Sequence, residues 1–137
     1  MGRGRKITDI TFLALSIWRE ARGESEECRE GVAQVVLNRV AGGGWWGNTI
    51  MSVLFKRRQF SSLTEPDDPQ LCTYPSEDDH SWKDCLTIAA RAIEGQMDNP
   101  VGDADSYFDI SIRPPYWADE ETFVKQIGRI NFHKVRK

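Results

Sequence analysis

Apolar residues near the N-terminus recur with the period of an α-helix. They fall at Ile10, Leu13, Ala14, Ile17, Trp18 and Ala21. This spacing places them on one face of an amphipathic helix. Asp9 is suited to the N-cap, and Gly23 to the left-handed position that follows a helix. We predict a helix over residues 10–22, preceded by a flexible basic arm at residues 1–8.

The next segment, residues 26–41, is apolar on more than one face. A helix with this pattern is usually buried, so it should be the central helix of the core. Ser25 can cap its N-terminus, where acidic side chains also favour the helix dipole. Three consecutive glycines, residues 42–44, should end it.

The remaining pattern changes from helices to short strands. Asn48 or Thr49 can cap a short helix, residues 61–79 indicate a long loop, and residues 82–94 a third long helix. Residues 106–108 are compatible with a strand, and residues 123–133 with a hairpin around a Gly-Arg turn. Helices followed by strands predict an α+β, mainly helical fold with a small β-hairpin region near the C-terminus. We expect a single domain over residues 1–137, with flexible basic ends at residues 1–8 and 134–137.

Charge and composition narrow the functional classes. The net charge of −3 gives no global field for nucleic acid. The basic ends indicate either solvated tails or docking onto an anionic envelope. We find no run of 18 apolar residues and no signal-peptide pattern, so the sequence predicts synthesis in a cytoplasm and no stable membrane association.

Cysteine and histidine usage gives no sign of a metal site. The three cysteines leave at least one thiol unpaired, although a bridge between Cys72 and Cys85 is conceivable. His80 and His133 lack the spacing of metal ligands. We therefore expect neither a metal nor a cofactor.

The segment from Trp18 to Glu24, WREARGE, is the best candidate for chemistry. Glu20 lies at the C-terminal end of the first predicted helix, where the helix dipole disfavours an ionised carboxylate and raises its pKa. A general acid that works near neutral pH needs such a shift. Periodicity alone favours a surface Glu-Arg pair instead.

Several collinear motifs carry a family resemblance. EARGE at residues 20–24 is followed by GVAQVVLNRV at 31–40, NTI at 48–50, QFS at 59–61, PYWA at 115–118, and IG and NF at 127–128 and 131–132. Together they resemble the SleB-type cell wall hydrolases, which include spore cortex-lytic enzymes and phage endolysins. The chain departs from the family pattern at Ser106-Tyr107-Phe108 and at Asn131-Phe132-His133.

The resemblance implies a lysozyme-like fold and cleavage of the β-1,4 bond between N-acetylmuramic acid and N-acetylglucosamine. Glu20 would be the catalytic residue of a lytic transglycosylase, which needs one carboxylate. A hydrolytic muramidase would use two, and the candidates for the second are Asp103, Asp105 and Asp109. A non-catalytic wall-binding module is the remaining alternative.

Other residues are candidates for contacts with the sugar. Gln59 and Ser61 could hydrogen-bond N-acetyl groups or Glu20, and Tyr107, Tyr116 and Trp117 could stack on sugars or belong to the core. Asn38 is either a site residue or a buried structural one. The basic run Lys56-Arg57-Arg58 is either a solvated helix end or a contact for an acidic stem peptide.

The expected partner is therefore peptidoglycan. The pattern is that of a monomeric phage endolysin, held in the host cytoplasm until a holin-type membrane permeabiliser releases it to the wall.

Overall fold

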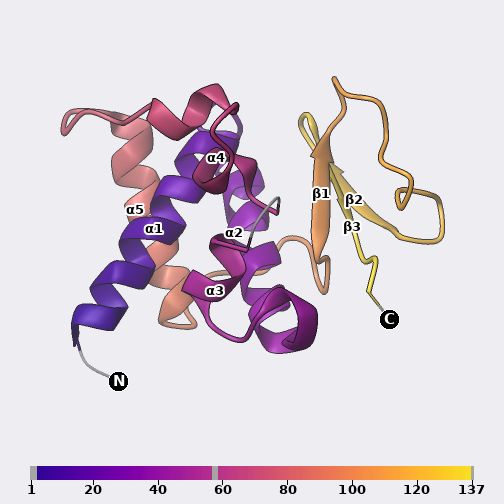
Figure 1. Ribbon diagram of the computed structural model, residues 1–137, viewed down its shortest axis with the longest axis horizontal. Helices are drawn as coiled ribbons and strands as arrows, with labels where there is room; N and C mark the ends of the chain where they lie inside the picture. Colours follow the sequence, from indigo (N-terminus) through magenta and orange to yellow (C-terminus); the bar gives the residue numbers. More distant parts are fainter. Residues whose placement is uncertain (1–2, 57–58, 137) are drawn as a thin grey trace.

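The structure, a computed structural model, describes residues 3–56 and 59–136. Helices form one side of the molecule and a small sheet forms the other (Figure 1). The elements are α1 (Arg3–Ala21), α2 (Glu26–Gly42), η1 (Gly44–Trp46), α3 (Ile50–Leu54), α4 (Ser61–Thr64), η2 (Pro69–Cys72), α5 (His80–Ile93), β1 (Ser106–Asp109), β2 (Phe123–Ile127) and β3 (Ile130–His133). The predicted α+β, mainly helical fold with strands near the C-terminus is confirmed.

The core lies where α1, α2 and α5 pack together. Leu13 and Ile17 of α1 are fully buried, as are Val32 and Val36 of α2. Burying a side chain of this size stabilises the fold by about 1.5–3 kcal/mol. The apolar faces of α2 thus explain its central place, as the sequence predicts.

The sheet is antiparallel in the order β1-β3-β2. The β2–β3 hairpin turns at Gly128, which has a φ of 57°, and Tyr107 of β1 pairs with Phe132 of β3. Phe132 is fully buried, and a Cβ on Gly31 of α2 would lie 2.7 Å from its ring. Glycine at position 31 therefore lets the sheet approach the helices closely.

Several boundaries differ from the prediction. α1 begins at Arg3, so the N-cap predicted at Asp9 is wrong and residues 3–8 extend the helix. The expected loop at 61–79 contains the short helices α4 and η2. Ser25 caps α2 and Thr49 caps α3, as the sequence predicts. The conceivable bridge between Cys72 and Cys85 is not formed, because both thiols are free.

Candidate active site

Glu20 lies in the last turn of α1, half-buried, and faces the sheet. Its Oε1 accepts a hydrogen bond of 2.7 Å from the phenol of Tyr107 on β1. This bond connects the helical side of the molecule to the sheet side. It also fixes one carboxylate oxygen, so the orientation of the carboxyl group is set by two different elements.

The surroundings of Glu20 change its acidity. Burial raises the pKa of Glu20 above its ordinary value, and the negative charge of Asp68 raises it further. The hydroxyls of Tyr107 and Ser62 act in the opposite direction, and burial prevails. Burial also raises the pKa of Tyr107 well above its usual value, so the phenol remains a donor. A carboxyl group that keeps its proton at higher pH is suited to general acid catalysis.

Arg19 of α1 holds the α4 segment and the chain after η2 against α1. Arg19, which is 8% exposed, donates hydrogen bonds to the carbonyl oxygens of Ser62 at 2.8 Å and Thr73 at 3.2 Å. Ser62 is fully buried. The Arg19 guanidinium therefore places the Ser62 hydroxyl close to the carboxylate that follows Arg19 in the sequence.

A cavity of about 470 Å³ adjoins Tyr107. It is lined by Arg39, Trp45, Trp46, Gln59, Ser106, Tyr107, Tyr116, Trp117, Val135 and Arg136. Aromatic rings beside hydrogen-bonding groups are the usual composition of a sugar-binding surface, since rings stack on the apolar faces of sugars. The cavity thus has space and chemistry for a saccharide next to the Glu20–Tyr107 pair.

Four of the predicted binding residues line this cavity: Gln59, Tyr107, Tyr116 and Trp117. Tyr116 is 98% exposed and free to meet a ligand. Trp117 is half-buried, with its ring centroid 6.0 Å from that of Phe108. Tyr107, which could stack on sugars or belong to the core, donates its hydroxyl to Glu20.

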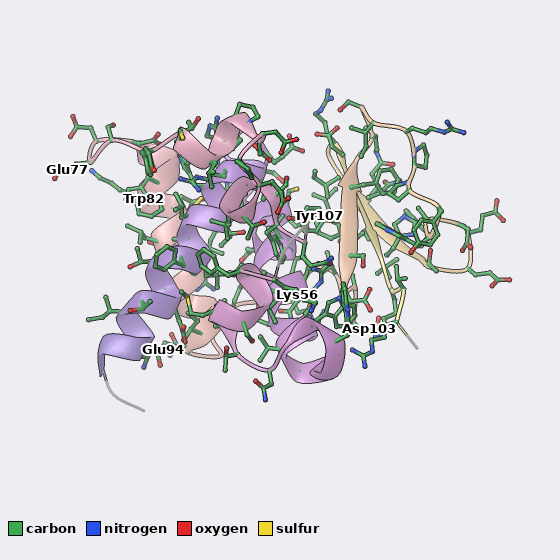
Figure 2. The ribbon with its side chains drawn as sticks, in the orientation of Figure 1. Lys56, Glu77, Trp82, Glu94, Asp103 and Tyr107 are labelled. Carbon is green, nitrogen blue, oxygen red and sulfur yellow. The ribbon has the colours of Figure 1, made fainter. Side chains whose placement is uncertain are left out.

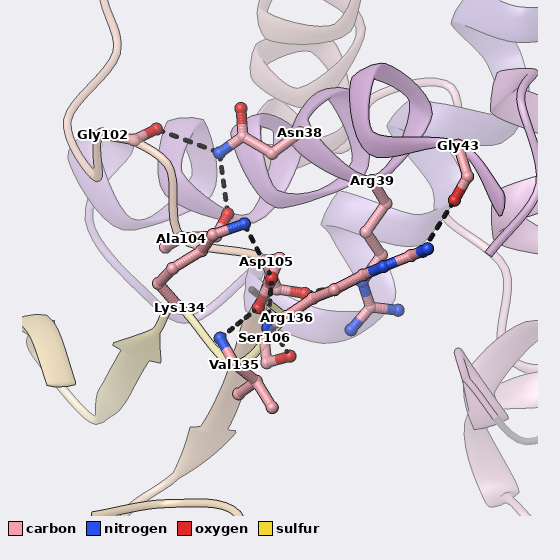
Figure 3. A network of polar contacts seen from close by, with 10 residues as sticks. All are labelled: Asn38, Arg39, Gly43, Gly102, Ala104, Asp105, Ser106, Lys134, Val135 and Arg136. Atoms are coloured by element: carbon pink, nitrogen blue, oxygen red, sulfur yellow. Dashed lines mark hydrogen bonds and ion pairs between the residues drawn. The ribbon is translucent and has the colours of Figure 1, made fainter. Parts of the chain in front are cut away.

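Ser61 and Asn38 lie elsewhere. The Ser61 hydroxyl donates to Asp68 at 2.6 Å, and its buried neighbour Ser62 approaches Glu20 instead. The Asn38 amide donates to the carbonyl oxygens of Gly102 and Ala104 at 3.0 and 2.7 Å (Figure 3). Asn38 therefore holds the loop that precedes β1, which favours the structural alternative.

The three aspartates considered as second carboxylates do not face Glu20. Asp105 is 1% exposed and binds the C-terminal segment. Asp109 pairs with Arg129 at 3.4 Å. Asp103 is exposed and lies well away from Tyr107 in Figure 2. Asp68 is the carboxylate whose charge acts on Glu20.

This geometry can be compared with known proteins. The cell wall hydrolase family matches the chain over residues 23–133. The chain belongs to the cell wall hydrolase family. Spore cortex-lytic enzymes of Bacillus cereus and Oceanobacillus iheyensis are each 30% identical to it over 96% of its length. The chain spans less than half the length of these curated relatives, 46% and 44%.

Solved structures of the family share the fold. The catalytic domain of the germination-specific lytic transglycosylase SleB from Bacillus anthracis is 29% identical, with a TM-score of 0.74 over 98% of this chain and all of that one. The catalytic domain of Bacillus cereus SleB is 30% identical, with a TM-score of 0.70 over 92% of this chain and 89% of that one. The predicted resemblance to SleB-type hydrolases is confirmed.

In this family member, Glu24 has a role that the sequence did not indicate. Glu24 is half-buried, and its Oε1 accepts a hydrogen bond of 2.9 Å from the backbone N–H of Arg129. Arg129 lies in the β2–β3 turn. The second glutamate of the EARGE motif therefore ties the end of α1 to the hairpin.

Sequence reasoning also missed Arg39, Ser62, Asp68 and Arg136. Arg39 is the one with a usable signal, because it lies within the apolar helix α2 and is 7% exposed. A charged residue in a buried helix needs partners, and the cavity explains its place. Ser62 lies in the four-residue helix α4, which is too short to show a period, and Asp68 and Arg136 lie in irregular segments.

The remaining expectations concern the basic run Lys56-Arg57-Arg58, metal ions and membranes. Arg57 and Arg58 lie outside the described residues, while the Lys56 ammonium is 4.4 Å from the centroid of the Trp45 ring. Residues 3–56 and 59–136 contain no group of three or more His, Cys, Asp or Glu that could hold a metal ion. In the same residues, no helix combines the length and apolarity needed to cross a bilayer.

Proposed function

We propose that this chain is a lytic transglycosylase that cleaves the β-1,4 bond between N-acetylmuramic acid and N-acetylglucosamine in peptidoglycan. The observation that carries the proposal is the Glu20 carboxyl group. It is half-buried with a raised pKa, held by the Tyr107 phenol and next to an aromatic cavity.

In the proposed reaction, Glu20 acts first as an acid and then as a base. Protonated Glu20 gives its proton to the glycosidic oxygen as the bond to muramoyl C1 breaks. The C6 hydroxyl of the same muramoyl residue attacks C1, and Glu20 takes the hydroxyl proton. A 1,6-anhydro ring forms, no water is consumed, and Glu20 is regenerated. One carboxyl group is sufficient for both steps.

The Tyr107 hydrogen bond suits both steps. The phenol donates to one carboxylate oxygen, which leaves the other for the substrate. It also stabilises the ionised form that exists between the two proton transfers. The similarity to the catalytic domain of Bacillus anthracis SleB, a germination-specific lytic transglycosylase, supports the same chemistry.

Product analysis on purified peptidoglycan tests the proposal. The wild type should release fragments with 1,6-anhydromuramoyl ends, lighter than the hydrolytic products by the mass of one water. Glu20→Gln should release none, because an amide can neither donate nor accept the catalytic proton. Glu77→Gln, an exposed residue far from Tyr107 in Figure 2, is the matched control and should cleave normally. Cleavage by Glu20→Gln would refute the assignment.

A hydrolytic muramidase is the second candidate, because the charge of Asp68 acts on Glu20. In that case Asp68 would supply the second carboxylate that glycoside hydrolysis normally requires. The digest would then carry reducing muramoyl ends, and Asp68→Asn would abolish their release. If the protein is a transglycosylase, the digest should carry anhydromuramoyl ends and Asp68→Asn should remain active.

The biological setting is a further proposal. We propose that the protein is a monomeric phage endolysin that reaches the wall when a holin-type partner permeabilises the membrane. The sequence resemblance supports this setting. Expression in a Gram-negative host should lyse the cells when a membrane permeabiliser is added, and lysis of intact cells without one would contradict the proposal.

A further inference from the structure

Two arginines flank one tryptophan in the wall of the cavity. The Arg39 Cζ atom lies 5.4 Å from the Trp46 ring centroid, and the Arg136 Cζ atom lies 5.1 Å from it. Figure 3 shows that Arg39 comes from α2 and Arg136 from the C-terminal segment. The two cations therefore reach one cavity from segments that lie far apart in the sequence.

Among the described residues, neither arginine forms a salt bridge with an acidic side chain, although the charge of the buried Asp105 carboxylate also acts on Arg39. Arg39 donates to the carbonyl oxygen of Asp105 at 2.6 Å and to Gln59 Oε1 at 3.4 Å. Arg136 donates to the carbonyl oxygen of Gly43 at 2.9 Å. The residues that line the cavity include no aspartate or glutamate. Its wall is consequently positive, although the chain as a whole is acidic.

The position of Arg136 is fixed in advance. Its backbone N–H and that of Val135 donate to the buried carboxylate of Asp105, at 3.0 and 2.8 Å. A Cβ on Gly44 would lie 2.6 Å from Arg136 Nη2, so glycine leaves room for the guanidinium. A fixed guanidinium loses less conformational entropy when it binds an anion.

We propose that Arg39 and Arg136 form a carboxylate subsite that binds the acidic substituent of the muramoyl residue at the cleaved bond. This inference rests on the proposed function. In a strand of the two amino sugars, the anionic groups are the carboxylates on the muramoyl side, either the free lactyl group or the stem peptide. N-Acetylglucosamine is neutral. The subsite would therefore set which sugar lies on which side of Glu20.

The test measures binding separately from cleavage. Glu20→Gln protein is titrated with soluble glycan strands of three kinds: strands with stem peptides, strands stripped by an amidase to free lactyl carboxylates, and peptide-bearing strands whose carboxylates have been converted to amides. Amidation should weaken binding about tenfold, the order expected for one hydrogen bond to a charged group. The stripped strands show which carboxylate the subsite prefers.

Arg136→Gln in the Glu20→Gln background decides the assignment. It should weaken binding to strands with carboxylates about as much as amidation does, with little further loss on the amidated strands. Arg136→Lys should recover part of the affinity because it keeps the charge. Arg91→Gln on α5, which removes the same charge away from the cavity, should bind as the parent does.

The two proposals fail in different ways. The subsite would be overturned if Arg136→Gln weakened binding to amidated and native strands equally, since that would indicate a structural effect. It would also be overturned if the Glu20→Gln parent bound amidated strands as tightly as native ones. Anhydro products from the wild type would persist in either case. If the protein bound strands with carboxylates more tightly than amidated strands but the wild type cleaved neither, the subsite would stand and the transglycosylase would be refuted.

Discussion

At the residue scale, the central feature is one carboxyl group whose environment opposes its ionisation. Burial and Asp68 raise the pKa of Glu20, while two hydroxyls lower it. The raised pKa means that the folded protein holds this proton at a pH where the unfolded chain has released it. Folding stability is therefore lost as the pH rises from the unfolded pKa through the folded one.

Glu20→Gln should consequently stabilise the fold while it abolishes cleavage. Above the folded pKa, the wild type must bury a charge that the amide lacks, so the melting temperature of Glu20→Gln should exceed that of the wild type at neutral pH. The gap should close on acidification, where Glu20 is protonated. Thermal melts of both proteins across pH measure the effect. A gap that stays constant across pH would contradict the burial argument.

Two substitutions around Glu20 should move the pH profile in opposite directions. As the general acid, Glu20 must be protonated, so kcat/KM should fall as the pH rises through its pKa. Tyr107→Phe removes a donor that favours the ionised form, which should move this alkaline limb to higher pH. Asp68→Asn removes a negative charge, which should move it to lower pH. If the alkaline limb moved in the same direction in both variants, these two groups would not act through Glu20.

At the element scale, α1 carries the chemistry at its C-terminal end and the sheet supplies the phenol. Glu20 bonds Tyr107 on β1, and four residues later Glu24 bonds the β2–β3 turn. Both contacts join the last turn of α1 and the residues just after it to the sheet. Positions 20 and 24 are one helical turn apart in sequence, and the motif uses both to place one helix end against one sheet.

The Glu24 contact predicts a difference between two substitutions. Glu24→Gln keeps an oxygen that can accept from the Arg129 N–H and should retain most activity. Glu24→Ala removes the acceptor and should destabilise the protein by about 1 kcal/mol. The Arg129 amide should then exchange faster with solvent than in Glu24→Gln, as measured by hydrogen exchange. Equal exchange in the two variants would show that Glu24 does not hold the turn.

The elements also show what a sequence can predict. The period of the apolar residues predicts α2 and α5 well, because buried helices must repeat their apolar positions. It misplaces the start of α1, since Asp9 is an acceptable cap that the helix passes through. It could not choose between Ser61 and Ser62, because α4 has four residues and no resolvable period. Glu20 was found through the family resemblance, while Arg136 required the tertiary fold.

At the scale of the whole molecule, the C-terminal segment 134–136 connects the sheet to the helices. Its Lys134 ammonium is 3.3 Å from the buried Asp105 carboxylate, which also accepts the backbone N–H groups of Val135 and Arg136. Arg136 continues to the carbonyl oxygen at the end of α2. Residues 134–136, which the sequence places in a flexible basic end at 134–137, thus bond both to Asp105 and to the end of α2, while residue 137 lies outside the described part.

Removal of residues 134–137 should accordingly cost stability, beyond any loss of docking to an anionic envelope. Asp105 would keep its charge and lose three donors, which should destabilise the fold by about 3 kcal/mol. Asp105→Asn should partly restore the stability of the truncated chain, because a neutral amide is less costly to leave unpaired. In the full-length chain the same substitution should be destabilising, because the amide accepts these donors less well than a carboxylate. Denaturant titrations of the full-length and the truncated chain, each with and without Asp105→Asn, give the sign of the stability change in each background. A substitution that acts alike in both would show that the segment does not stabilise the Asp105 charge.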